Sequence, residues 1–352
     1  MRIWIFSGLA LWLWPVMIVG GLGLGLPLGA AVPVGALVAT ALSAPLSALL
    51  DRSVGAALVS SRALSLTILG CTLAAVVQIA SLSVFIADPH HARFSMSPGD
   101  PFRTQHSCMS SYAEAARFLA EGGHNIYEGT RYQPRFIGPL KVDFYHYPPP
   151  FLLIPQVLHA ISGDFLRFRA LWFVFQALVL VGTVVAVAAW VRQAGGAFAL
   201  AGGSLLLAAP PVLYTLQQGN FQATAAPLAG LACMLIASRR LPAGAALLAY
   251  TAAAKIFPGI ILVYLAAARR WRVLAWTAAL GLVLVGATLL TQGTRPTIDF
   301  LTHALPEISS GTAFPHTEQP NTTAVNGSVY GMTVRLRRLG MTMFDRSTGM
   351  QV

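Results

Sequence analysis

The chain has 352 residues, of which 56% are hydrophobic and only 10% are charged, and its mean hydropathy is +0.66. Soluble domains carry about 25% charged residues, so this composition excludes an ordinary soluble protein. The net charge of +11 would suit nucleic-acid binding. However, the basic residues form short clusters between apolar runs, as expected for cytoplasmic loops, and no basic stripe with interleaved aromatic residues is present. We therefore expect a membrane protein with no nucleic-acid partner.

Long apolar runs recur along the chain and predict membrane-spanning helices. A helix of ~20 residues crosses the hydrocarbon, and a helix pairs its backbone polar groups within one segment. We therefore expect an all-α, polytopic transmembrane helix bundle of about 8–11 spans, although residues 151–161 are too few to cross alone. The candidate spans cover residues 4–24, 30–50, 63–87, 151–161, 166–191, 197–213, 223–237, 243–268 and 273–290.

Basic clusters at residues 239–240 and 269–272 flank the apolar segment 241–268. Both clusters favour the cytoplasmic side, and a single span cannot place both of them there. Lys255 and Pro258 lie in the middle of the segment, and proline breaks a helix. The pattern favours a hairpin of two short helices that turns near Lys255. The alternative is one kinked span with one basic cluster on the opposite side.

Two large polar segments interrupt the apolar sequence, at residues 88–150 and 291–333. The distribution of arginines around the neighbouring spans places both segments on the outer side of the membrane. Two outer loops over a helical bundle would enclose a substrate chamber. We expect a single integral-membrane domain over residues 1–340, followed by a short polar tail over residues 341–352.

The first polar segment combines an amphipathic helix with a rigid motif at the membrane edge. Residues 111–121 place apolar side chains on one helical face, and Gly122 follows as a helix terminator. The segment ends at Tyr147-Pro148-Pro149, where polar sequence changes to apolar sequence. This is the position at which an enzyme acting on a lipid-linked substrate would hold its reactive groups.

The three cysteines and eight histidines show no spacing typical of a disulfide framework or a metal site. Two of the cysteines lie in apolar runs, where packing is the ordinary role of the residue. The sequence therefore predicts no metal site and no cofactor.

The order of several motifs resembles glycosyltransferase family 87 of the GT-C superfamily, over about residues 60–340. Each motif is weak alone, and the resemblance depends on their sequence and spacing. The motifs are the helix ending at Gly122 followed by Asn125-Ile126-Tyr127, then Tyr147-Pro148-Pro149, the amide-rich stretch 217–222, Lys255-Ile256-Phe257-Pro258, the basic cluster 269–272, and Asn326-Gly327-Ser328 followed by Arg335 and Arg338.

This resemblance implies a GT-C-like fold and a polyprenyl-phosphate sugar as donor. It implies transfer of a mannose-like hexose or a pentose to a lipid or cell-envelope glycan on the outer face. The protein would then be a multi-pass component of the plasma (inner) membrane, in contact with membrane lipid, with an active site that faces the periplasm or exterior. Relatives continue into further spans beyond the position of Val352, which implies a truncated or divergent end.

The family's presumed catalytic acid lies just before the amphipathic helix, but residues 105–110 contain no acid here. Glycosyl transfer needs a carboxylate that deprotonates the acceptor hydroxyl. Asp143, four residues before Tyr147, is the first candidate base, and Asp100 and Glu114 are alternatives. The simpler alternative is a solvated loop acid for Asp143 and an ordinary turn for Asp100, whereas Glu114 lies on the polar side of the helix and could point into the chamber.

Lys255 is the strongest candidate for binding the donor phosphate, because a charged side chain within an apolar stretch is costly and is functional by default. Arg103 is an alternative phosphate ligand on the first loop. Amides suit sugar hydroxyls, since they offer both a donor and an acceptor, and tyrosine rings can stack on a sugar face. A polar interhelical turn and interfacial anchoring are the simpler explanations. The remaining candidate substrate-binding residues are Gln218, Asn220, Gln222, Tyr145 and Tyr147.

Two alternatives remain open from the sequence. A transporter or flippase for a lipid-linked saccharide would place discontinuous helices near the membrane midplane, but the chain shows no internal repeat. A catalytically inactive relative is favoured by the missing acid and by the end of the chain.

Overall fold

The computed structural model describes residues 2–122 and 125–310. The chain forms two compact units, Met1–Thr297 and Ile298–Val352, which are described separately. Helices dominate the described residues, and the only sheet among them has strands of two or three residues. The prediction of an all-α polytopic bundle is thereby confirmed.

Five helices of the first unit are long and apolar enough to cross a membrane: α1 (Arg2–Gly23), α2 (Leu28–Ser60), α3 (Arg62–Ala87), α7 (Phe165–Val191) and α13 (Trp271–Gln292). The bent pair α8 (Gln193–Ala208) and α9 (Pro210–Gln218), with an angle of 57°, would make a sixth. Within residues 2–122 and 125–310, five or six helices therefore meet this length, against the 8–11 spans predicted for the whole chain. The other apolar segments form shorter helices, namely α6 (Leu153–Ser162), α10 (Gln222–Ala237), α11 (Leu241–Ala254) and α12 (Ile260–Ala267).

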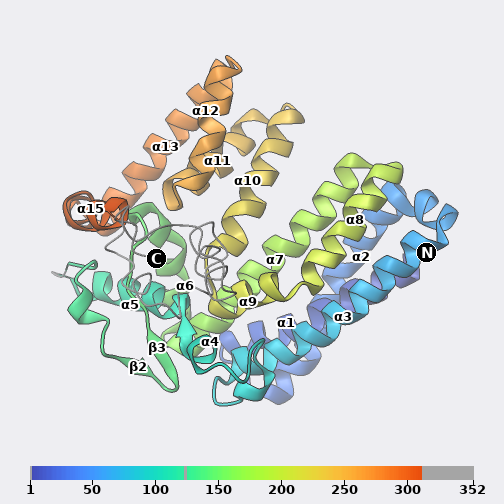
Figure 1. Ribbon diagram of the computed structural model, residues 1–352, viewed down its shortest axis with the longest axis horizontal. Helices are drawn as coiled ribbons and strands as arrows, with labels where there is room; N and C mark the ends of the chain where they lie inside the picture. The colour runs from blue at the N-terminus through green and yellow to red at the C-terminus, as the bar shows by residue number, and fades with distance from the viewer. Residues whose placement is uncertain (1, 123–124, 311–352) are drawn as a thin grey trace, which may run out of the picture. The chain divides into compact units, whose positions relative to one another are not determined.

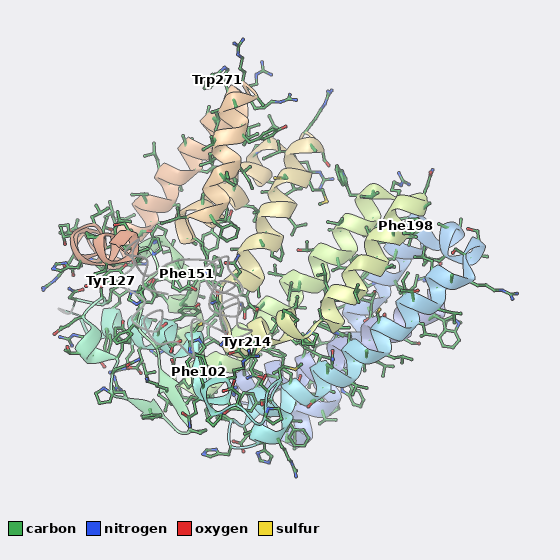
Figure 2. The ribbon with its side chains drawn as sticks, in the orientation of Figure 1. Phe102, Tyr127, Phe151, Phe198, Tyr214 and Trp271 are labelled. Atoms are coloured by element: carbon green, nitrogen blue, oxygen red, sulfur yellow. The ribbon has the colours of Figure 1, made fainter. Side chains whose placement is uncertain are left out.

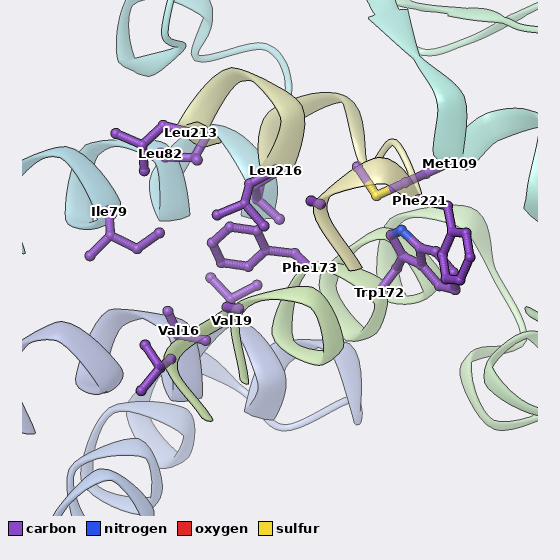
Figure 3. Packing of buried hydrophobic residues seen from close by; sticks show 14 of the residues in the cluster. Val16, Val19, Ile79, Leu82, Met109, Trp172, Phe173, Leu213, Leu216 and Phe221 are labelled. Carbon is purple, nitrogen blue, oxygen red and sulfur yellow. The ribbon is translucent and has the colours of Figure 1, made fainter. Parts of the chain in front are cut away.

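The long helices pack around an apolar core and present apolar side chains outward. Figure 3 shows side chains of α1, α3, α7 and α9 in this core, including Val16, Ile79, Phe173 and Leu216, each of which is fully buried. By contrast, Phe198 of α8 is 68% exposed (Figure 2). Outward-facing apolar side chains on helices of this length are what a lipid environment stabilises, so the protein is membrane-embedded.

Arg169 is a buried charge that joins α7 to the end of α3. Its Nη1 donates to the carbonyl oxygens of Phe85 and Ile86, at 2.7 Å each. Its guanidinium also lies 4.8 Å from the centre of the Phe85 ring. The last carbonyls of a helix have no partner within the helix, so Arg169 satisfies the end of α3 inside the protein.

Segment 241–268 folds as a hairpin. Leu248 of α11 and Leu265 of α12 belong to one buried cluster with Val273 of α13, which requires α12 to return alongside α11. The turn α10–α11 and the turn α12–α13 lie at the same end of these helices (Figure 1), and Trp271 marks that end in Figure 2. Both basic clusters are therefore on one side, as the hairpin interpretation predicted, and Lys255 lies at the opposite end.

The first polar segment folds into short elements that bring distant residues together. Its amphipathic helix α5 runs over Cys108–Glu121, three residues longer at the start than predicted, and ends at Gly122 with φ +74°. Strand β1 pairs in parallel with β3, which places His106 opposite Lys141 and Ser107 opposite Val142. The other elements are η1 (Ala92–Phe94), α4 (Pro101–Gln105), β1 (His106–Ser107), η2 (Gly129–Arg131), β2 (Phe136–Ile137), β3 (Leu140–Val142) and η3 (Pro149–Leu152), with η4 (Phe257–Gly259) in the hairpin.

The described part of the second polar segment is helical rather than a loop. It contains α14 (Arg295–Asp299), the π-helical stretch η5 (Phe300–Ala304) and α15 (Leu305–Ser310). Residues 311–333, the motif that begins at Asn326 and the predicted tail 341–352 lie outside the described residues.

Candidate active site

Three polar side chains from distant parts of the sequence meet at the turn of the hairpin. The Nζ of Lys255 lies 3.3 Å from Oδ1 of Asn220 and 3.4 Å from the hydroxyl of Tyr147. The ammonium also lies 5.1 Å from the centre of the Tyr147 ring. The structure thus brings together the predicted phosphate ligand, one predicted sugar ligand and the tyrosine of the Tyr-Pro-Pro motif. We call Lys255, Asn220 and Tyr147 the lysine cluster.

Asn220 is held by a turn that is fixed on several sides. Gly219 closes helix α9 with φ +68°, a conformation that favours glycine. The indole N–H of Trp172 donates to the backbone carbonyl oxygen of Gly219 at 2.8 Å. The side-chain amide of Gln176 donates to the backbone carbonyl oxygen of Asn220 at 2.8 Å. Met109 packs close to Trp172 and Phe221 over this turn (Figure 3). The backbone of the turn therefore has little freedom, and the amide of Asn220 is preoriented.

Tyr147 is fixed by an aromatic network. The hydroxyl of Tyr112 donates to the hydroxyl of Tyr147 at 2.9 Å, and the hydroxyl of Tyr127 donates to its backbone carbonyl at 2.9 Å. The Tyr147 ring stacks on Phe151, with centroids 4.4 Å apart, and Figure 2 labels Tyr127 and Phe151. Burial raises the pKa of Tyr147, so its phenol stays neutral and can donate a hydrogen bond.

Lys255 has no acidic partner among the ion pairs that the described residues form. Its two polar contacts are with an amide oxygen and a phenol oxygen, both neutral. Neutral acceptors hydrogen-bond an ammonium group without cancelling its charge. The lysine cluster therefore keeps a net positive charge in a half-buried position, which is suited to binding an anion.

Asp143 lies in a second group with His106 and Cys108. One carboxylate oxygen of Asp143 is 3.1 Å from Nδ1 of His106, and the sulfur of Cys108 is 3.7 Å from Nε2 of the same ring. Burial lowers the pKa of His106, but the charges of Cys108 and Asp143 outweigh it and raise the pKa well above its usual value. We call these residues the His-Cys-Asp cluster.

The other two candidate acids already have strong partners. Glu114 is buried, and its Oε2 accepts from Arg117 at 2.7 Å and from Arg135 at 2.6 Å. Asp100 caps helix α4 and pairs with Nε of Arg103 at 3.2 Å. Arg103 in turn lies over the ring of Tyr214 at 4.9 Å. These ion pairs therefore stabilise the fold of the first polar segment.

The remaining predicted substrate ligands lie around the lysine cluster without joining it. Gln218 is buried and donates to the hydroxyl of Tyr214 at 2.6 Å. Gln222 is exposed, and its backbone N–H donates to Oδ1 of Asn220. Tyr145 is 1% exposed, which leaves no face of its ring for a sugar in this conformation.

Sequence reasoning missed His106, Cys108 and Tyr112 as parts of the site. The first two lie 35 or more residues before Asp143 and are joined to it by strands of only two and three residues. Strands this short carry no readable alternation of apolar and polar residues. Tyr112 follows Cys108 by one turn of a helix that contains many small residues. This spacing was the sequence signal that could have indicated that the two side chains lie on the same helical face.

The model of glycosyltransferase family 87 matches residues 145–349, more than half of the chain. The chain belongs to glycosyltransferase family 87. The match includes all three members of the lysine cluster, whereas Asp143, Asp100 and Glu114 lie before its first residue. No curated protein and no solved structure gives a significant match. Family membership and the apolar helices together make the protein a membrane-embedded glycosyltransferase, which uses a sugar donor and an acceptor.

Proposed function

We propose that this family 87 glycosyltransferase transfers a sugar from a polyprenyl-phosphate donor to a lipid or cell-envelope glycan at the outer face of the plasma membrane. The observation that carries the proposal is the lysine cluster. A half-buried ammonium, whose hydrogen-bond partners among the described residues are neutral oxygens, lies at the turn of an apolar hairpin. Such a site suits a phosphate attached to a lipid, because the phosphate supplies the missing negative charge while its tail stays among apolar helices.

In this proposal Lys255 binds the donor phosphate as a point charge and stabilises it as it leaves. Tyr147 adds a neutral hydroxyl donor beside the same phosphate. Asn220 accepts from Lys255 through Oδ1 and keeps its amide N–H groups available for an oxygen of the donor. These three residues would act on the leaving group rather than on the acceptor.

Asp143 is the best-supported base, because Asp100 and Glu114 are occupied by arginines. Its side chain is 16% exposed, so it is sheltered but reachable. Its backbone N–H donates to Ser110 of α5, and the same helix carries Tyr112, whose hydroxyl donates to Tyr147 of the lysine cluster. A carboxylate in this position would take the proton of the acceptor hydroxyl.

The outer location rests on the two basic turns of the hairpin. Arg239, Arg240, Arg269 and Arg270 are exposed and lie in the turns just before α11 and α13, whereas Lys255 follows the other end of α11; the two turns lie at the same end of these helices (Figure 1). Positive residues favour the cytoplasmic side. Lys255 and the first polar segment would then face the periplasm or exterior.

The test is sugar transfer by purified protein in lipid nanodiscs, with a panel of labelled polyprenyl-phosphate sugars that includes hexose and pentose donors. Lys255→Ala should abolish turnover and weaken donor binding. Lys141→Ala is the matched control, because Lys141 is the other lysine of the chain and its side chain has no contact with the lysine cluster. Full donor binding and turnover by Lys255→Ala would refute the phosphate role. Donor binding without transfer in any acceptor mixture would instead favour a carrier of lipid-linked saccharides.

A further inference from the structure

The His-Cys-Asp cluster has the geometry of a metal site. One possible ligand atom from each of His106, Cys108 and Asp143 lies within 4.8 Å of the others. The three groups are an imidazole, a thiol and a carboxylate, and all are partly or largely sheltered from solvent. Within residues 2–122 and 125–310, this is the group of three such side chains that converges closely enough to hold an ion.

The backbone fixes this convergence. The parallel pairing of β1 and β3 sets Ser107 opposite Val142, so the next residues along the two segments, Cys108 and Asp143, lie side by side. Ser110 locks the arrangement, because its hydroxyl donates to the carbonyl of Ser107 at 2.6 Å and accepts from the N–H of Asp143 at 3.0 Å. The ligand atoms are therefore placed by the fold and not by chance contacts of mobile side chains.

A hydrogen-bonded relay of thiol, imidazole and carboxylate explains the cluster less well. The two nitrogens of an imidazole point to opposite edges of the ring. Asp143 contacts Nδ1 and Cys108 contacts Nε2, as in a relay, but an in-line relay would also hold the sulfur and the carboxylate on opposite edges of the ring, far from each other. Here the sulfur of Cys108 and a carboxylate oxygen of Asp143 lie within 4.8 Å of each other, which suits one shared ion.

A disulfide does not account for Cys108 either. All three cysteines are free, and Cys71 and Cys233 belong to the apolar helices α3 and α10. Cys108 begins α5 in the outer loop, next to an imidazole and a carboxylate. Its surroundings are those of a ligand.

We propose that His106, Cys108 and Asp143 bind a divalent transition-metal ion of the zinc class. Thiolate, imidazole and carboxylate are the ligand types that zinc accepts, and three protein ligands leave one position of a tetrahedral site open. Two anionic groups would balance the charge of the ion. The family resemblance and the family match assign no metal to these residues.

The position of the cluster suggests what the ion does. Cys108 lies one helical turn before Tyr112, whose hydroxyl donates to Tyr147 of the lysine cluster. An ion at this place would bind an acceptor hydroxyl or a donor oxygen at its open position and act as a Lewis acid. It would use one oxygen of Asp143 and leave the other free to take a proton. This role rests on the proposed function, whereas metal binding itself does not.

The test uses cobalt as a spectroscopic probe. Purified full-length protein in nanodiscs is stripped with a chelator, dialysed and titrated with Co²⁺, followed by displacement with Zn²⁺. We expect one ion per chain, a visible spectrum of tetrahedral Co²⁺ and a near-ultraviolet band from thiolate-to-cobalt charge transfer. Cys108→Ser should abolish that band. His106→Ala and Asp143→Asn should each weaken binding by at least about tenfold, since even losing an outer-shell partner costs ~10–100-fold.

Two controls separate this site from other sources of binding. The double variant Cys71→Ser/Cys233→Ser must keep the band, and Asp88→Asn must keep the affinity, because Asp88 pairs with His90 and His91 in an exposed group elsewhere in the loop. Cys108→His guards against misfolding, since it should keep the ion while losing the charge-transfer band. No tetrahedral binding by the native protein, a band that survives Cys108→Ser, or affinity lost only in Asp88→Asn would overturn the proposal. Because none of these readouts measures sugar transfer, failure here leaves the proposed function standing.

Discussion

The ammonium of Lys255 lies 3.3 Å from the side-chain oxygen of Asn220, although α10, α11 and a basic turn separate the two residues in the sequence. Because no acid among the described residues pairs with Lys255, the charge of this contact can be altered by one nearly isosteric change. Asn220→Asp would place a carboxylate beside the ammonium and cancel the charge that would bind the proposed donor phosphate. We expect donor affinity to fall by roughly ten- to hundredfold, the value of one charge-assisted hydrogen bond, with unchanged or higher thermal stability.

Titration with a polyprenyl phosphate in nanodiscs measures this affinity. Asn220→Ala is the control, because it removes the amide without adding charge and should cost less. Equal losses in the two variants would show that the amide contact, and not the charge of Lys255, governs binding.

Gly219 is expected to be intolerant of a side chain. A Cβ at this position would lie 2.0 Å from Cγ of Met109, and the backbone has φ +68°. Gly219→Ala should destabilise the protein by about 2–4 kcal/mol, from overpacking together with backbone strain. Gly293→Ala isolates the strain, since Gly293 has φ +75° and nothing within 4 Å of the added Cβ. Thermal unfolding in detergent compares them, and a loss for Gly219→Ala no larger than for Gly293→Ala would contradict the packing argument.

Arg169 should be structural. Arg169→Met removes the donor to the carbonyls of Phe85 and Ile86 and should cost about 1–3 kcal/mol for each carbonyl left buried without a partner. Arg167→Met, at an exposed ion pair with Asp164, should change stability by less than about 1 kcal/mol. Thermal unfolding of both variants measures the two losses of stability. A loss for Arg169→Met as small as that for Arg167→Met would mean that water hydrates the last carbonyls of α3.

Substitution of Glu114 should affect mainly stability, whereas substitution of Asp143 should affect mainly turnover. Glu114→Gln leaves Arg117 and Arg135 without their shared carboxylate, so we expect a lower unfolding temperature but near-normal turnover in the folded fraction. Asp143→Asn should lose turnover by at least about 100-fold, the lower range of general-base effects, while the loop stays folded. Single-turnover kinetics and circular dichroism on the same samples distinguish these outcomes, and the reverse pattern would make Glu114 the base.

The sequence predicted the hairpin and the members of the lysine cluster better than it predicted which side chains meet in the first polar segment. A lysine within an apolar run is energetically costly, and two basic turns restrict which side of the membrane each helix end can face. Both features can therefore be recognised in a single sequence without an alignment. The described residues contain five or six helices long enough to span, against the 8–11 expected, because several apolar segments, such as residues 223–237, form helices of 16 residues or fewer. The engagement of Glu114 by Arg117, three residues later, was readable as a helical i,i+3 pair, but its second partner, Arg135, comes from a distant segment.

The hairpin also links the enzyme to the thickness of its membrane. The 14 residues of α11 rise only about 21 Å from the basic turn, against ~30 Å of hydrocarbon in a typical bilayer. The neighbouring α13, with 22 residues, is long enough to cross completely. The turn at Lys255 therefore lies below the level that a full span reaches, and it is there that Lys255 contacts Tyr147. If the donor is a polyprenyl phosphate, as proposed, hydrophobic mismatch sets how far its headgroup must sink to reach the ammonium, and we expect turnover to depend on the chain length of the surrounding lipid.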